Sequence, residues 1–73
     1  MQIFKLRKTD EFIKLGQLLK ACGLCDSGID AKEAIVQGLV IVDGEVETRR
    51  GRKLYDGAEV EYDGEKISVQ KQI

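Results

Sequence analysis

Residues 40–54, VIVDGEVETRRGRKL, combine a turn signal with a dense group of cations. Asp43-Gly44 stands between β-branched residues, and Asp-Gly in that setting favours a type I′ hairpin, whose two central residues need positive φ. Four cations then follow within five residues: Arg49, Arg50, Arg52 and Lys53. The stretch therefore predicts a hairpin that presents a basic arm, residues 49–53.

Two registers are open for this hairpin. A two-residue loop would place Ile41 opposite Val46, whereas a three-residue loop would place Val42 opposite Val46. The three-residue loop gathers more apolar area on the face that also carries Val40. We therefore prefer the three-residue loop as the prediction.

A first short helix is expected before the hairpin, over residues 14–22. Four apolar residues follow the i, i+3, i+4, i+7 spacing of one helical face: Leu15, Leu18, Leu19 and Cys22. Thr9-Asp10-Glu11 could cap its start, because a hydroxyl or carboxylate can accept from the free N–H groups of a first turn. Gly23 is a suitable stop, since it tolerates positive φ.

A second helix is expected between Ser27 and Gly38. Ser27 is a preferred N-cap residue, and Gly38 provides the C-terminal stop. Ala31, Ala34 and Ile35 form a narrow stripe of small apolar residues. Such a stripe suits close packing against the first helix.

The chain begins and ends with expected strands. Residues 2–6, QIFKL, predict a short strand, and Asp63-Gly64 predicts a second hairpin. A two-residue loop in that hairpin gives three reasonable cross-strand pairs: Val60 with Ile67, Ala58 with Val69, and Glu61 with Lys66. The predicted fold is α+β, with two short packed helices and a small, mainly antiparallel sheet built from two Asp-Gly hairpins and a short N-terminal strand.

Length and composition are those of a small globular protein. The 73 residues predict a single domain over 1–73, with 42% apolar and 34% charged residues. A chain of this size buries only about 60% of its unfolded surface, which lowers the expectation of an enzyme with a large pocket. The sequence shows neither an apolar run of about 18 residues nor a signal peptide, so we expect a cytoplasmic monomer without membrane contact.

The charge of the chain is sorted along its length. The net charge is −1 and the sequence pI is about 5.4, which alone would argue against a nucleic-acid ligand. However, residues 49–53 carry four cations and no acid, while residues 56–65 carry five acids and no cation. A phosphate responds to the field within a Debye length of about 8–10 Å, so the basic arm can still attract a polyanion.

Catalytic and metal chemistry have little support in the sequence. The chain has no histidine to activate a serine or threonine nucleophile. Glu59 and Glu61 alternate with apolar residues on an expected strand, which is typical of a solvated face. We predict no catalytic residue, no metal site and no cofactor.

Cys22 and Cys25 form a C-x-x-C pair that could have several roles. A structural zinc site needs about four ligands, and thioredoxin-like chemistry expects a βαβ unit, so neither is favoured. Core packing is the preferred interpretation, because Cys22 lies on the apolar face of the first helix. A weak redox or metal role and a zinc site shared between molecules remain alternatives.

The basic arm is the sharpest functional signal, although a charge run can also serve only solubility. Arginine has a planar fork that suits bidentate phosphate contact, and Gly51 would let the backbone approach a phosphate. The neighbouring helices could add Lys14, Lys32 and Ser27, the last with a hydroxyl at a helix N-terminus. Lys14, Lys20 and Lys32 could equally be ordinary surface lysines.

A series of residues also matches a known family pattern: Ile13-Lys14-Leu15-Gly16-Gln17-Leu18-Leu19-Lys20, Ser27-Gly28, Ala31-Lys32, Ile35, Gly38, Val40, Val42-Asp43-Gly44-Glu45, Glu47-Thr48-Arg49-Arg50-Gly51-Arg52-Lys53-Leu54 and Gly57. This pattern resembles the alpha-L RNA-binding motif, the domain of ribosomal protein S-four that also occurs in pseudouridine synthases and bacterial tyrosyl-tRNA synthetases. The chain looks most like small stand-alone bacterial proteins made of that domain. The resemblance covers residues 12–69, and its specific part is 42–54.

The resemblance implies RNA-facing roles for Lys14, Ser27, Lys32 and the four cations of the arm, Arg49, Arg50, Arg52 and Lys53. Lys14 stands where the family usually has an arginine, so charge is kept but bidentate contact is lost. Asp43 replaces the more common asparagine of the turn and adds a negative charge near the expected surface.

The sequence thus predicts a non-enzymatic protein that binds structured RNA, ribosomal or transfer RNA, through phosphate and 2′-hydroxyl contacts. Aromatic residues are few, so stacking on single-stranded bases is not the expected mode. The main alternative is a protein–protein adaptor whose acidic hairpin, residues 56–65, docks a basic partner on ribosomes or RNA enzymes. Thiol redox chemistry is a third possibility.

Overall fold

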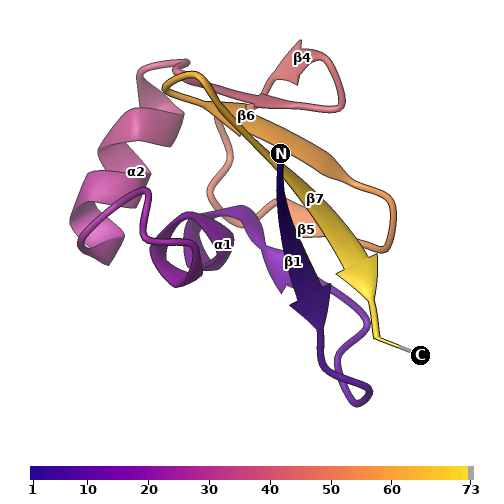
Figure 1. The fold of residues 1–73 in the computed structure, drawn as a ribbon. Coiled ribbons are helices and arrows are strands. Elements are labelled where there is room, and N and C mark those ends of the chain that lie inside the picture. The colour runs from indigo at the N-terminus through magenta and orange to yellow at the C-terminus, as the bar shows by residue number, and fades with distance from the viewer. Residues whose placement is uncertain (73) are drawn as a thin grey trace.

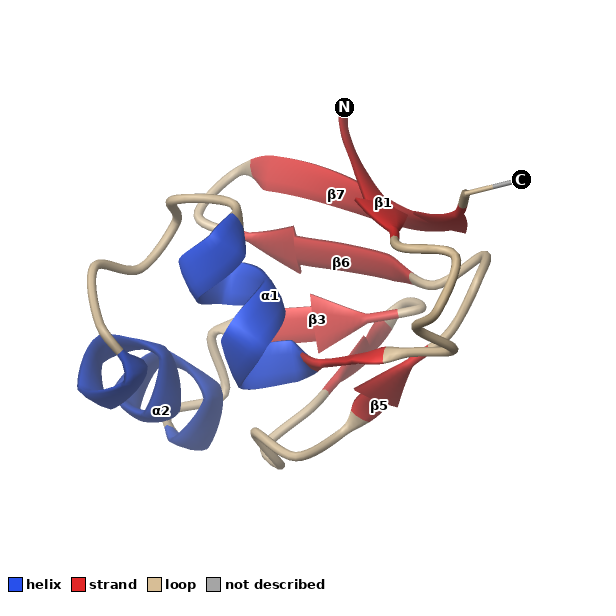
Figure 2. Cartoon of the chain, turned by 90° about the horizontal axis from the view of Figure 1, so that it is seen from below, coloured by secondary structure: helices blue, strands red, loops and turns tan. Residues whose placement is uncertain are grey.

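The structure is a computed structural model that describes residues 1–72. The elements of this part of the chain are β1 (Gln2–Leu6), β2 (Ile13–Lys14), α1 (Leu15–Ala21), α2 (Gly28–Val36), β3 (Val40–Val42), β4 (Glu45–Val46), β5 (Lys53–Leu54), β6 (Glu59–Tyr62) and β7 (Glu65–Lys71). The two helices pack against each other on one side of the strands (Figures 1 and 2). The architecture confirms the predicted α+β class.

Five strands form the main sheet in the order β1-β7-β6-β3-β4. β1 runs parallel to β7, and the other three pairings are antiparallel, so the sheet is mainly antiparallel as predicted. A separate ladder joins β2 to β5. The sequence did not indicate this ladder, because a two-residue strand is too short to show an alternating pattern.

Both Asp-Gly pairs form tight turns. The φ angles are 50° and 86° at Asp43 and Gly44, and 52° and 78° at Asp63 and Gly64. Positive φ at both central residues is the mark of a type I′ turn, which fits the twist of a two-residue hairpin. In the second hairpin Val60 lies opposite Ile67, which is the register expected from the sequence.

The preferred register of the first hairpin was wrong. Ile41 lies opposite Val46, so the loop has two residues rather than three, and Val46 is 60% exposed. The prediction favoured the register that gathers more apolar area on the face carrying Val40. In the structure Val40 and Val42 already lie in the core beside Val60 of β6, the strand that pairs with β3, so Val46 is not needed on that face.

The ends of the helices largely follow local signals. The Ser27 side chain accepts from the Asp30 N–H at 3.2 Å, and Gly38 follows α2 with a φ of 79°. Thr9-Asp10-Glu11 does not cap α1: Asp10 instead bonds to Arg7, and Lys14 occupies the N-cap position. Consequently α1 is one residue shorter at each end than the predicted helix over 14–22.

A continuous core lies between the helices and the strands. It gathers the apolar faces of both helices with inward-facing residues of the strands: Leu6, Leu15, Leu18, Leu19, Cys25, Ala31, Ala34, Ile35, Val40, Val42, Leu54, Val60, Ile67 and Val69. Among the described residues, neither helix has the length and apolar character needed to cross a membrane.

Candidate nucleic-acid interface

The backbone of the basic arm is fixed to the start of α1. The N–H of Leu15 donates to the carbonyl of Arg52 at 2.9 Å, and the N–H of Gly16 donates to the carbonyl of Arg50 at 3.1 Å. These bonds satisfy two of the N–H groups that the first turn of a helix leaves without an intrahelical partner. The arm is therefore a positioned part of the fold.

The β2–β5 ladder brings one predicted helix residue directly to the arm. Lys14 of β2 lies opposite Lys53 of β5. The two positions are far apart in the sequence, and the ladder makes them cross-strand neighbours. Like charges directly opposite each other in a ladder are destabilising.

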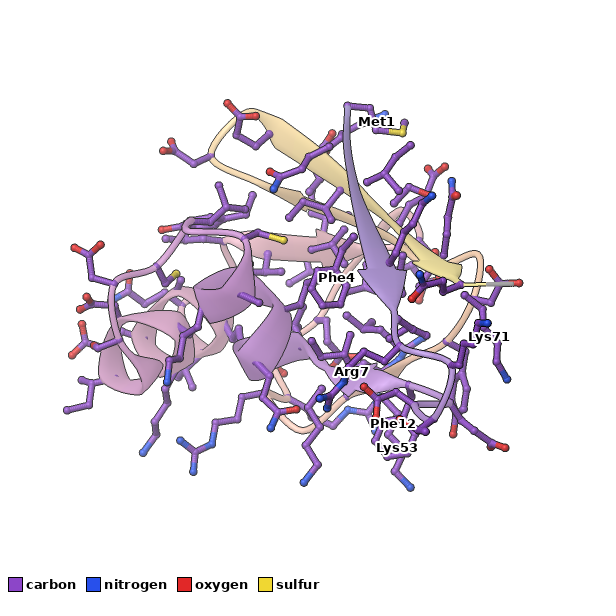
Figure 3. All side chains as sticks on the ribbon, turned by 60° about the horizontal axis from the view of Figure 1, so that its bottom comes forward. Met1, Phe4, Arg7, Phe12, Lys53 and Lys71 are labelled. Atoms are coloured by element: carbon purple, nitrogen blue, oxygen red, sulfur yellow. The ribbon has the colours of Figure 1, made fainter. Side chains whose placement is uncertain are left out.

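A shallow hollow lies beside this ladder, between α1, the start of α2 and the arm. Its lining residues are Lys14, Gly16, Gln17, Lys20, Gly28, Arg50 and Gly51. Three cations from separate segments thus face one hollow. In Figure 3 nitrogen-tipped side chains project along the lower edge of the molecule, where Lys53 is labelled. We use the name basic face for the predicted site residues together with Lys20, of which only Lys14, Lys20 and Arg50 line the hollow: Lys14, Lys20, Ser27, Lys32, Arg49, Arg50, Arg52 and Lys53.

Two arginines of the arm are paired within the chain. Arg49 donates to Glu47 through Nε at 3.0 Å and Nη2 at 3.2 Å, and Arg52 donates to Glu47 through Nη1 at 2.7 Å. The Glu47 side chain is only 8% exposed, whereas that of Arg49 is 73% exposed. Hydrogen bonds from Arg49, and then from Arg52, lower the pKa of Glu47 to about 2. Glu47 therefore stays ionised and offsets part of the charge of the arm.

The other two arm cations have no acidic partner among residues 1–72. Arg50 lines the hollow, and the Lys53 ammonium lies 5.0 Å from the centre of the Phe12 ring. The sequence treated the four cations as equivalent. The pairing with Glu47 separates them into two arginines with an acidic partner and two cations without one among the described residues.

The two remaining predicted residues, Ser27 and Lys32, do not line the hollow. The Ser27 hydroxyl accepts from the Asp30 N–H and so caps α2. Lys32 is exposed on α2 but does not line the hollow. Lys20, for which the sequence left open the choice between a binding lysine and an ordinary surface lysine, does line it. Its spacing of three from Gln17 was the signal that could have placed it on that side of α1.

The cysteines pack as the preferred interpretation predicted. Cys25 belongs to the core, Cys22 packs against it, and both are free thiols. Burial raises the pKa of both thiols, and the carboxylates of Asp30 and Asp26 raise that of Cys25 further. A raised pKa keeps a thiol protonated and weakens it as a nucleophile or metal ligand.

The sequence of the chain matches a known protein family. Residues 4–70 match the family model described as the S4 domain. The match spans nearly the whole chain, so the protein belongs to the S4 domain family. The resemblance seen in the sequence is thereby confirmed.

Individual relatives are similar over most of their length. The chain is 42% identical to YbcJ of Escherichia coli (strain K12), named as a candidate RNA-binding protein, over 69 residues that cover 94% of this chain and 97% of YbcJ. It is 46% identical over 54 residues to RlbA of Bacillus subtilis (strain 168), named as a probable ribosome maturation protein, covering 74% of this chain and 76% of RlbA.

A solved structure is also similar. The solution structure of YbcJ from E. coli, described as revealing an alfaL motif involved in RNA binding, aligns with a TM-score of 0.71 and 41% identity. The alignment covers 96% of this chain and 87% of that one. The helices and mostly antiparallel sheet described above therefore form an alpha-L fold.

Proposed function

We propose that this protein is a non-enzymatic RNA-binding protein that docks structured RNA through the basic face. The observation that carries the proposal is the joining of the arm to α1, which brings Lys14, Lys20 and Arg50 around one hollow. The names of YbcJ and the description of its structure support RNA as the ligand class. The name of RlbA favours ribosomal RNA over transfer RNA within the proposal.

A phosphate backbone would relieve an unfavourable feature of the free protein. Lys14 and Lys53 are like charges on directly opposing positions of a short ladder. A phosphate between them would replace repulsion by two favourable contacts. Structured RNA suits such a site, because proteins contact its 2′-hydroxyls and phosphates across the wide minor groove.

The adaptor alternative has weaker support. Two of the five acids in residues 56–65 already have internal partners: Asp56 accepts from the Lys71 N–H at 3.0 Å, and Glu61 lies 4.0 Å from the Lys66 ammonium. Because these two carboxylates already have partners within the chain, fewer acids of the hairpin are left for a basic partner protein. Sedimentation with ribosomes that disappears on RNase treatment would favour RNA binding, and RNase-resistant sedimentation would favour the adaptor.

A salt titration tests the proposal directly. The affinity for a structured RNA, measured by fluorescence anisotropy, should fall with salt, and about four to six phosphate contacts give a slope of roughly −3 to −5 in log K against log salt. Lys14→Ala combined with Lys20→Ala should weaken binding about tenfold at low salt and make the slope shallower by about 1–2.

The matched control removes the same charge from another part of the fold. Lys66→Ala combined with Lys71→Ala changes two exposed lysines of β7, and neither lines the hollow. This variant should keep the affinity and nearly all of the salt slope. Binding without salt dependence, or equal losses in the two variants, would contradict the proposal.

A further inference from the structure

The outer face of the β2–β5 ladder carries side chains other than those that line the hollow. Ile13 lies opposite Leu54, and Lys14 lies opposite Lys53. Leu54 is buried in the core and Ile13 packs against it. Because successive side chains of a strand point to opposite faces, Lys14 and Lys53 point away from the core.

Two aromatic residues continue this outer face. Phe12 and Tyr55 stand one residue beyond Ile13 and Leu54, and their ring centres are 5.7 Å apart at an interplanar angle of 53°. Tyr55 is 51% exposed. Neither ring belongs to the core or packs against it. We name Phe12, Lys14, Lys53 and Tyr55 the lysine–aromatic face.

Lys53 connects the lysines of this face with its aromatic side chains. The Lys53 ammonium lies 5.0 Å from the centre of the Phe12 ring, and Figure 3 shows the two labelled side chains together at the lower edge of the molecule. This cation–π contact favours a position of Lys53 beside the aromatic pair. The exposed ring of Tyr55 remains available for a further stacking contact.

The chemistry of this face fits a nucleotide rather than a phosphate alone. Single-stranded nucleic acid is bound where cations hold the backbone and aromatic rings stack on the bases. Here two lysines and two aromatic rings share one outer face, and Lys14 also lines the basic hollow. A nucleotide on this face would thus be continuous with RNA docked on the hollow.

We infer that the lysine–aromatic face holds one unpaired base of the bound RNA, stacked on Tyr55, with its phosphate between Lys53 and Lys14. The inference rests on the proposed function and narrows its ligand class. The ligand is a paired RNA segment that carries an adjacent unpaired nucleotide, such as a bulge. Stacking here concerns one base beside a helix, which differs from the single-strand mode that the sequence disfavoured.

The test compares three RNA duplexes of otherwise identical sequence: fully paired, with a single bulged adenosine, and with an abasic nucleotide at the bulge. The abasic bulge keeps the phosphate and the bend but removes the base. The wild-type protein should bind the adenosine bulge at least about fivefold more tightly than the abasic bulge, the lower end of the effect of one base–aromatic stack.

Variants of Tyr55 assign this preference to the ring. Tyr55→Leu should bind the adenosine bulge no better than the abasic one, and Tyr55→Phe should keep the preference. With 2-aminopurine at the bulge, the wild type should quench its fluorescence and Tyr55→Leu should not. Because Tyr55 lies outside the core, both variants should keep the wild-type circular dichroism spectrum.

The outcomes separate the inference from the proposed function. Salt-dependent binding of all three duplexes with equal affinity would overturn the inference and leave the proposed function intact. Absence of binding to any structured RNA, ribosomal RNA included, would overturn both. If Tyr55→Leu impaired only an RNase-resistant association with a protein, the face would be a protein-docking surface and the inference would be wrong.

Discussion

The β3–β4 hairpin and the β6–β7 hairpin share the same turn, yet they play different parts in the molecule. Their Asp-Gly pairs have nearly the same φ angles. Val60 and Ile67 of the second hairpin face each other in the core, whereas Val46 of the first is largely exposed. The turn dipeptide thus sets the local backbone, and burial decides how far the ladder continues beyond it.

The lengths of the two ladders have consequences for function. β7 runs for seven residues and joins β6 to β1 within the main sheet. β4 has only two residues, after which the chain leaves the sheet and forms the arm. Glu47, just beyond β4, turns into the protein and holds Arg49 and Arg52. The long hairpin therefore forms part of the main sheet, and the short one leads directly into the basic arm.

The largest expected difference between the hairpins comes from the same substitution in each. Val60→Ala removes two methyl groups from a side chain that is 1% exposed and should lower the free energy of unfolding by about 2–3 kcal/mol. Val46→Ala should change it by less than about 0.5 kcal/mol, as expected for a surface position. Urea denaturation measures both, and equal losses would contradict the contrast drawn between the two ladders.

The second prediction concerns the link between the short hairpin and the arm. Glu47→Gln should lower the free energy of unfolding at pH 7 by about 2 kcal/mol, because it removes a buried carboxylate from two arginines. Since Arg49 is exposed, this loss is smaller than the full pKa shift of Glu47 would give. Thermal or urea unfolding measures the loss. Glu45→Gln, an exposed change in β4, is the control and should have little effect.

The same carboxylate gives a pH dependence with a definite sign. The pKa of Glu47 is lowered from 4.5 to about 2 in the folded protein, so its contribution is complete above pH 4.5 and is lost as the pH falls towards 2. In urea denaturation between pH 5 and 2, Glu47→Gln should therefore lose less stability than the wild type. If the variant followed the wild-type curve throughout this window, the Glu47 carboxylate would not be the source of this pH dependence.

The smallest expected effect tests what the hairpins have in common. Gly44→Ala and Gly64→Ala each place a Cβ on a residue with positive φ, and no heavy atom beyond the two neighbouring residues lies within 4 Å of that Cβ at either site. Each should therefore cost about 1 kcal/mol, the conformational penalty of a left-handed residue, and the two costs should be nearly equal. Denaturation of the two variants under one set of conditions measures this. Clearly unequal costs would contradict this expectation and show that the surrounding tertiary structure also affects the stability of the turns.

Much of the fold could be predicted because its signals are local. The Ser27 cap, the Gly38 stop and both Asp-Gly turns depend on a few neighbouring residues and their allowed φ angles. The apolar face of α1 and the register of the second hairpin follow from periodicity. Two failures concern distant partners: the β2–β5 ladder, and the register of the first hairpin, where pairing with β6 already places β3 in the core. The expected Thr9-Asp10-Glu11 cap was a local failure, because Asp10 bonds to Arg7 instead.

The candidate site divides in the same way. The sequence alone singled out the four cations of the arm, because side-chain charge is a property of the residue and four cations in five positions stand out anywhere. Only the tertiary structure decided which of them Glu47 neutralises, that Lys14 faces Lys53, and that Phe12 meets Tyr55. These relations depend on burial and on backbone pairing between distant segments, so they exist only once the chain has folded.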